Sequence, residues 1–182
     1  MSEYTDIELL EMFRKADTSD YAFNLMVRKY QKQIYWNVRR MVMNHEDADD
    51  ITQNVFIKVW RNLNNFREAS QLSTWIYRIS VNETITFINK QKIKSFLSFS
   101  NYETHLSNAL KDDAGFNGNH IERTLQQALL TLPPKQRLTF NMRYYDELPY
   151  EKISEILGTS VGALKASYHL AVKKIEKFVS EN

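Results

Sequence analysis

The sequence contains no cysteine, which excludes disulfide bonds and thiolate metal sites and suits a reducing cytosol. With four glycines and three prolines in 182 residues, helix-breaking residues are scarce, and we expect a mostly helical fold. No run of about 18 apolar residues occurs, and the first residues do not resemble a signal peptide, so we expect a cytoplasmic protein without membrane insertion. The net charge of +2 excludes a chain that is basic throughout, so any DNA-binding surface must be a local patch.

Apolar residues recur at helical spacing along most of the chain. The spacing predicts helices over residues 4–15, 20–44, 46–63 and 73–92, and the pattern resumes from residue 121. Residues 94–120 are rich in Ser and Asn and lose this periodicity, which is typical of a flexible linker, with room for one short helical piece. We therefore expect an all-α protein in which helical domains at 1–93 and 121–182 are joined by a flexible linker at 94–120.

The stretch EKISEILGTSVGALKASYHLAVKKI, residues 151–175, predicts two helices with a sharp corner between them. Gly158 suits the end of the first helix, and Thr159 or Ser160 suits the cap of the second. This order is typical of a helix-turn-helix motif. The outer face of the second helix carries small residues first and lysines later, as a helix in the DNA major groove requires. The alternative is a plain helical hairpin with a solvated lysine face.

The stretch EDADD, residues 46–50, places acidic residues at the start of a helix. They can serve there simply by facing the positive end of the helix macrodipole. The alternative is a binding face for a basic partner surface. Asp47, Asp50 and Asn54 lie about one turn apart, as do Asp49 and Gln53. A metal site at His45 and Asp49 would lack a second histidine, so we expect no metal.

A polar stripe runs along the helix predicted at residues 73–92. Its members are Arg78, Asn82, Ile85, Asn89 and Lys92, with Trp75 beside them. Aromatic, amide and cationic groups on one face can bind single-stranded DNA. The alternative, favoured for Trp75 taken alone, is an amphipathic helix with its tryptophan in the core. We find no glycine-rich phosphate loop and no nucleophile–base arrangement, so we expect neither enzymatic activity nor a cofactor.

Two blocks of the sequence resemble the extracytoplasmic-function (ECF) group of bacterial RNA polymerase sigma factors. Residues 47–92 contain Asp-Ala-x-Asp, Gln-x-x-Phe and Thr-Trp-x-Tyr-Arg-Ile, which resemble the promoter-melting domain of that family. Residues 132–175 begin with Leu-Pro-x-x-x-Arg and resemble its C-terminal DNA-binding domain. Two motif blocks in the right order are more specific than either alone.

This resemblance implies a role for each surface. Asp47, Asp50 and Gln53, with Asn54 beside them, would dock on the β′ clamp of core RNA polymerase. The loop that captures a flipped base of the −10 element would include Phe66, Arg67, Ser70 and Ser73. The melted strand would lie along Trp75, Arg78 and Asn82. The −35 element would meet Lys165, Ala166, Ser167, His169 and Leu170, with Lys173 and Lys174 on phosphates.

The resemblance implies three partners: core RNA polymerase, promoter DNA and an anti-sigma factor. The polymerase would be met through its β′ clamp and its β flap, and the anti-sigma factor would hold the two domains closed. The free chain would be a monomer. One departure concerns Ser167 and Leu170, where the family often has arginines. Because arginine is the strongest reader of guanine edges, we expect more shape readout or apolar contact here. The alternatives are a helix-turn-helix regulator that acts without polymerase and an interaction protein whose basic helix binds another protein.

Overall fold

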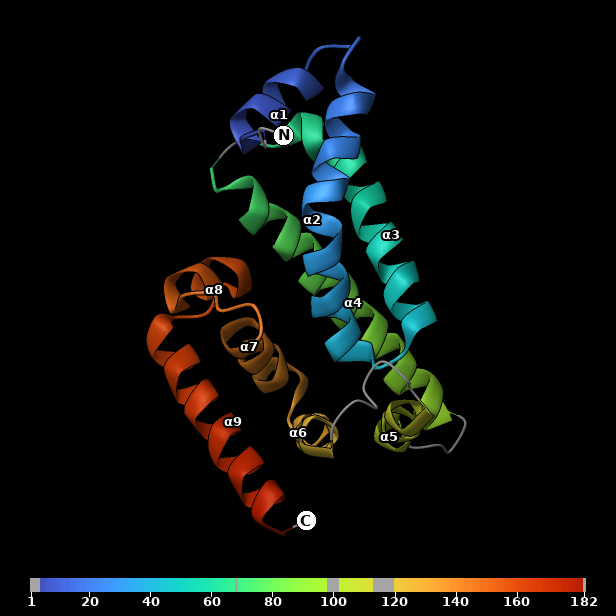
Figure 1. The fold of residues 1–182 in the computed structure, drawn as a ribbon, viewed down its shortest axis with the longest axis vertical. Helices are drawn as coiled ribbons and strands as arrows, with labels where there is room; N and C mark the ends of the chain where they lie inside the picture. The colour runs from blue at the N-terminus through green and yellow to red at the C-terminus, as the bar shows by residue number, and fades with distance from the viewer. Residues whose placement is uncertain (1–3, 68, 98–101, 113–119, 182) are drawn as a thin grey trace.

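The structure, a computed structural model, describes residues 4–67, 69–97, 102–112 and 120–181 (Figure 1). All of the regular elements in these ranges are helices: α1 (Asp6–Phe13), α2 (Ser19–Val42), α3 (His45–Asn62), the 3₁₀ turn η1 (Leu63–Asn65), α4 (Leu72–Leu97), α5 (Tyr102–Asp112), α6 (His120–Leu130), α7 (Pro134–Tyr144), α8 (Tyr150–Leu157) and α9 (Val161–Glu181). The all-α prediction is therefore confirmed. No helix in the described ranges is both long and apolar enough to cross a bilayer.

The N-terminal unit, α1 to α4, is built around three long helices. Figure 1 shows α2, α3 and α4 lying alongside one another. They bury apolar side chains at helical spacing, among them Met26, Ile34, Val38, Val55, Val59, Ile76 and Ile88. The turn between α2 and α3 is tight, because Met43 takes a left-handed conformation with φ 57° and ends α2. Asn44 then caps α3, its side-chain oxygen accepting a hydrogen bond from the Asp47 backbone N–H at 2.9 Å.

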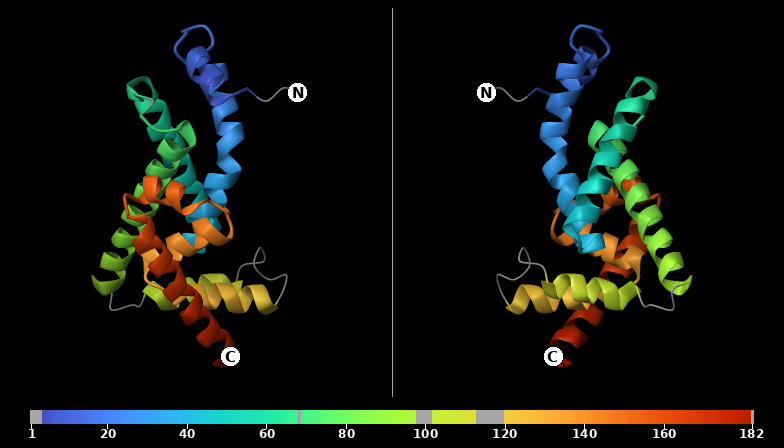
Figure 2. Two further views of the ribbon diagram at one scale, coloured as in Figure 1. Left: turned by 90° about the vertical axis from the view of Figure 1, so that its left-hand side faces the viewer. Right: turned by 90° about the vertical axis from the view of Figure 1, so that its right-hand side faces the viewer.

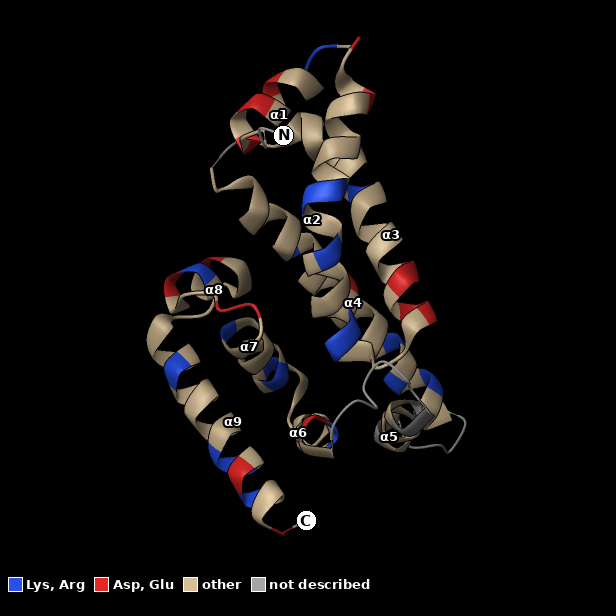
Figure 3. Ribbon diagram, viewed as in Figure 1, with Lys and Arg blue, Asp and Glu red and all other residues tan. Residues whose placement is uncertain are grey.

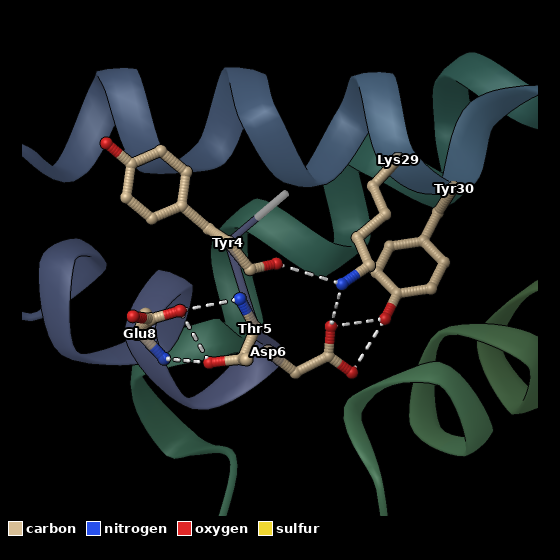
Figure 4. Close-up of polar contacts among 6 residues, drawn as sticks. All are labelled: Tyr4, Thr5, Asp6, Glu8, Lys29 and Tyr30. Atoms are coloured by element: carbon tan, nitrogen blue, oxygen red, sulfur yellow. Dashed lines mark hydrogen bonds and ion pairs between the residues drawn. The ribbon is translucent and has the colours of Figure 1, made fainter. Parts of the chain in front are cut away.

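The short helix α1 is fixed to α2 by the polar contacts in Figure 4. Thr5 and Glu8 form a reciprocal capping box at the start of α1. Asp6 accepts a hydrogen bond from the Tyr30 hydroxyl at 2.6 Å and pairs with Lys29 at 3.0 Å. Beneath these contacts the α1 side chains Leu9, Leu10 and Phe13 are buried. The first helix is therefore part of the bundle.

The C-terminal unit, α6 to α9, has its own apolar cluster. Its members are Ala128, Leu129, Leu132, Phe140, Ala171 and Ile175. Pro134 occupies the first turn of α7, where proline lacks only a donor that is unused. Between α8 and α9, Gly158 adopts φ 61°, the left-handed conformation expected of a glycine that ends a helix. The predicted helix-turn-helix geometry is present.

The segment expected to be a flexible linker is partly a packed helix. Helix α4 continues to Leu97, and α5 buries Tyr102, Leu106 and Leu110, which are four residues apart on one face. Figure 2 shows α5 and α6 crossing the lower end of the molecule, where the two helices are in contact. The remaining linker residues, 98–101 and 113–119, lie outside the described ranges.

The two units are in contact with each other. Helix α7 touches α2, and α8 touches α4. The buried cluster of the N-terminal unit extends into the C-terminal unit through Leu138, Met142, Ile153, Ile156 and Leu164. Apolar burial is therefore continuous across the boundary between the units.

Candidate polymerase and nucleic-acid interfaces

The start of α3 presents an acidic and amide face, visible as the red segment of that helix in Figure 3. Asp50, Gln53 and Asn54 are exposed along it. Asp47 is half-buried at its edge. Burial raises the pKa of Tyr102 on α5 to about 12, while Arg137 lowers it and Asp47 raises it, so both charges lie near that hydroxyl. Three of the four residues are therefore exposed, and the half-buried Asp47 lies near α5.

His45 and Asp49 form a local ion pair at the same helix start. His45 Nε2 lies 3.3 Å from an Asp49 carboxylate oxygen, and His45 Nδ1 lies 2.7 Å from the Tyr35 hydroxyl. Both ring nitrogens of the histidine therefore have protein partners. Across the described residues, no three His, Asp or Glu side chains gather as metal ligands.

A hollow of about 400 Å³ opens between α3, η1 and α4. Trp75 forms one wall and is held by Phe66, with the ring centroids 5.0 Å apart and the planes at 38°. The other lining residues are Lys58, Asn62, Asn65, Ile79, Asn82 and Glu83. Lys58 and Glu83 pair with each other. An aromatic face beside three asparagines is suited to a nucleobase, because bases stack on rings and amides bond their edges.

The loop before α4 has both buried and exposed residues. Phe66 is only 7% exposed, so it supports Trp75 from behind. Arg67 is exposed and Ser70 is half-buried, and residue 68 lies outside the described ranges. Ser73 belongs to the first turn of α4, which begins at Leu72. Sequence reasoning missed Asn62 and Asn65; the signal was the asparagine-rich run NLNN at 62–65.

The stripe on α4 meets the C-terminal unit. Arg78 donates a hydrogen bond from Nε to the Glu155 backbone carbonyl on α8, at 2.8 Å. Asn82 lies further along the stripe and lines a second cavity of about 500 Å³ between the units. Ser167 of α9 lines the same cavity. The structure thus brings together residues that the sequence assigned to two different DNA elements.

Helix α9 has the two faces that its sequence predicted. Ser160, rather than Thr159, caps it, accepting a hydrogen bond from the Ala163 backbone N–H at 3.3 Å. Leu164, Ala171 and Ile175 are buried. The exposed residues on the outer side include Lys165, Ala166, His169, Leu170, Lys173 and Lys174. Ser167 is half-buried and lines the cavity between the two units.

Two parts of the chain match known protein families. Residues 26–93 match the family model of Sigma-70 region 2, and residues 122–175 match that of Sigma-70 region 4. The chain is 31% identical over 176 residues to the ECF RNA polymerase sigma factor SigW of Bacillus subtilis, covering 92% of this chain and 93% of that protein. It is 32% identical over 190 residues to the ECF RNA polymerase sigma-E factor of Escherichia coli K12, covering 98% and 97%.

Two solved structures share the fold. One is CnrH in complex with the cytosolic domain of CnrY, with a TM-score of 0.68, 17% identity and coverage of 96% of both chains. The other is the sigma factor RpoE in complex with the anti-sigma factor NepR from Bartonella quintana, with a TM-score of 0.67, 18% identity and coverage of 87% of this chain and 96% of that one.

Proposed function

This chain belongs to the ECF group of RNA polymerase sigma factors. From that premise we propose which of its surfaces bind core polymerase and which bind promoter DNA during transcription initiation. The observation that carries the proposal is the presence of both sigma regions in one chain, each with an exposed polar surface. A helix-turn-helix regulator that acts without polymerase would need only the second region, so that alternative is not favoured. We propose that residues 1–93 and 121–182 act as two binding domains and that residues 94–120 link them.

The polymerase contact is assigned to the acidic face of α3. Asp50, Gln53 and Asn54 are exposed on a rigid helix, with Asp47 at their edge. Carboxylates and amides at this spacing suit a basic, hydrogen-bonding surface on core polymerase, which the family resemblance identifies as the β′ clamp. By the same resemblance, the C-terminal unit would meet the β flap.

The hollow beside Trp75 is assigned to a flipped base of the −10 element. Trp75 would stack on the base, and Asn62, Asn65 and Asn82 would bond its edges. Arg67, Ser70 and Ser73 would belong to the loop that captures the base, and Arg78 would follow the strand backbone; Ser70 and Arg78 line one hollow together with Glu155 of α8. Stacking of about 1–3 kcal/mol per base offsets unpairing of a few kcal/mol, so melting needs no catalysis from this chain.

The −35 contact is assigned to the outer face of α9. Ala166, Ser167, His169 and Leu170 lie early on the helix and would reach base edges, with Lys165 beside them. Lys173 and Lys174 lie later and would meet phosphates. Because serine and leucine replace guanine-reading arginines, apolar contact and DNA shape should carry more of the specificity.

The remaining parts of the proposal concern setting and partners. We propose that the chain is a cytoplasmic monomer when free and has no catalytic activity of its own. RpoE of Bartonella quintana has been solved with an anti-sigma factor, and we propose that an anti-sigma factor binds this chain too.

Run-off transcription with purified core polymerase tests the proposal. Genomic fragments are transcribed with and without the chain, and the transcript starts are sequenced. We expect discrete starts that require the chain and share −10 and −35 elements. DNA binding that never yields chain-dependent starts would favour the regulator, and absence of DNA binding with or without polymerase would favour a protein-interaction role.

A further inference from the structure

We propose that the strand-binding face of the N-terminal unit is also a docking surface for the C-terminal unit of the same chain. The free protein would close on itself and weaken its own DNA binding without any partner. The DNA-binding consequence rests on the function proposed above, whereas the closure rests only on contacts within the chain. These contacts are of three kinds.

The first contact is a buried polar cluster around Asp146, in the turn between α7 and α8. Its side chain is only 5% exposed. One carboxylate oxygen accepts a hydrogen bond from Asn37 Nδ2 at 2.8 Å, and the other lies 3.3 Å from Arg40 Nη1. The Arg40 guanidinium also lies over the Tyr145 ring, 4.2 Å from its centroid. Residues of α2 thus hold the turn between α7 and α8 by charge, hydrogen bond and ring contact.

The second contact lies on the predicted DNA-binding stripe. Arg78 donates to the Glu155 backbone carbonyl at 2.8 Å, so α8 occupies the place where a strand backbone would pass. Lys152 of α8 bonds the Gln71 side chain just before α4. Thr74 lies 3.5 Å from a Glu155 carboxylate oxygen. Helix α8 therefore supplies polar partners to Gln71, just before α4, and to Thr74 and Arg78 in its first two turns.

The third contact is apolar and buried. Val81 and Ile85 of α4 line one cavity together with Leu138, Ile156 and Leu164 of the C-terminal unit. Nearby, the buried Arg137 of α7 donates from Nη2 to the Met41 backbone carbonyl at the end of α2, at 3.0 Å. This bond satisfies one of the last carbonyls of a helix, which would otherwise need water or another cap. The units are thus joined by burial as well as by surface polar groups.

Closure covers the proposed strand-binding face but leaves the proposed polymerase-binding face exposed. Arg78 is engaged, and Asn82 and Ser167 face a shared cavity, so promoter DNA must displace the C-terminal unit from this face. Asp50, Gln53 and Asn54 stay exposed, so core polymerase can meet the closed form. When only a fraction of molecules is open, apparent DNA affinity falls by that fraction. An open population on the order of 10% would weaken strand binding about tenfold.

Distance measurements on the full chain test closure directly. Because the sequence has no cysteine, cysteines replacing the exposed Lys32 on α2 and Glu176 on α9 can carry a single pair of fluorescent labels. We expect one narrow, high-transfer population in the labelled protein alone. A broad, low-transfer distribution in the absence of any partner would overturn the proposal.

Charge reversal at Asp146 should open the molecule. The hydrogen bond and ion pair of its carboxylate are to residues of α2, so Asp146→Arg places a cation against Arg40 while leaving the C-terminal unit's own core intact. We expect Asp146→Arg to lower energy transfer and the added change Arg40→Asp to restore much of it. Glu147→Arg, an equal charge change at the exposed neighbouring residue, is the matched control. Unchanged transfer in Asp146→Arg with retained helicity would overturn the proposal.

The same variants then report on DNA. The probe is a fluorescent single strand carrying the −10 non-template sequence of a promoter found by run-off transcription. We expect Asp146→Arg to bind it about tenfold more tightly than the parent chain, and the charge swap to lose much of that gain. If energy transfer shows that Asp146→Arg is open, but this variant and the parent chain bind the strand with equal affinity, the inhibitory role is overturned. If closure is seen but no variant binds DNA, the proposed function fails while the closure stands.

Discussion

Asp146 shows how a residue can join two units without adding much stability. Burial raises the pKa of its carboxyl above the ordinary 3.8, although Asn37 and Arg40 both act to lower it. The desolvation of the carboxylate therefore outweighs the two favourable partners. A buried ion pair of this kind contributes little net stability but costs several kcal/mol when only one partner is removed.

The raised pKa makes closure depend on pH. In the open form Asp146 would be in water at its ordinary pKa, so the closed form binds a proton more tightly. The free energy that Asp146 contributes to closure is then fully present below its ordinary pKa in the open form. This contribution is lost as the pH rises through its raised pKa in the closed form. We expect the closed fraction, measured by energy transfer, to rise as pH falls from neutrality into that window. Asp146→Asn should stay closed and lose this dependence; the same dependence in that variant would assign it to another group.

Asn82 allows strand separation to be distinguished from strand binding. It lines the hollow beside Trp75 and is exposed on α4. Asn82→Ala should reduce open-complex formation on duplex promoters more than on pre-melted ones, by roughly 1–3 kcal/mol for a lost base contact. Asn108→Ala, the same change at an exposed asparagine on α5 outside the stripe, is the control. Equal losses on both templates would show that Asn82 binds DNA without helping to separate it.

At the scale of single elements, helical periodicity predicted the major helices but not every contact between them. The spacing of Ile51, Val55 and Val59 was sufficient to place α3, since one apolar face requires one buried side. Asn62 and Asn65 were missed because their role depends on where η1 packs relative to α4. Similarly, the meeting of Arg78 with Glu155 joins residues far apart in sequence, and no local pattern encodes it.

The corner between α8 and α9 depends on one backbone conformation. Gly158 has φ 61°, and a methyl group there would meet nothing within 4 Å, so strain alone decides the effect of Gly158→Ala. We expect a loss of about 1–2 kcal/mol in the free energy of unfolding, measured with urea. Gly162→Ala is the matched control, because Gly162 is helical and equally uncrowded, and it should be neutral or stabilising by up to about 1 kcal/mol. Equal losses would argue against the left-handed cap.

The outer face of α9 should contain residues that contact bases and residues that contact phosphates. Ser167 and His169 changes should alter the preferred −35 sequence, whereas Lys173→Ala and Lys174→Ala should weaken all sequences alike and each lower the salt slope by about one. Ala166→Glu should abolish −35 use by bulk and charge. Holoenzyme binding to a randomised −35 library at two salt concentrations measures these effects. A change of sequence preference in the lysine variants alone would contradict the assignment.

For the whole molecule, the accessible α3 face separates docking from DNA binding. Asp50→Arg combined with Gln53→Ala should weaken core polymerase binding by at least tenfold without loss of helicity, since both side chains are exposed. Asp49→Arg changes charge in the same part of the helix, but on the neighbouring side, where Asp49 pairs with His45, and should have a smaller effect. Losses of equal size would mean that the acidic turn acts through the helix macrodipole.

The contact between the two units has a consequence for gene dosage. A separate inhibitor can be outnumbered when its target is overproduced, but α8 and α4 belong to one polypeptide and are always present in equal number. Their effective concentration is set by the connecting chain, of the order of millimolar for short connections, and not by copy number. The closed fraction would therefore stay the same under overexpression. The number of open molecules able to bind DNA would remain smaller than the number of molecules made.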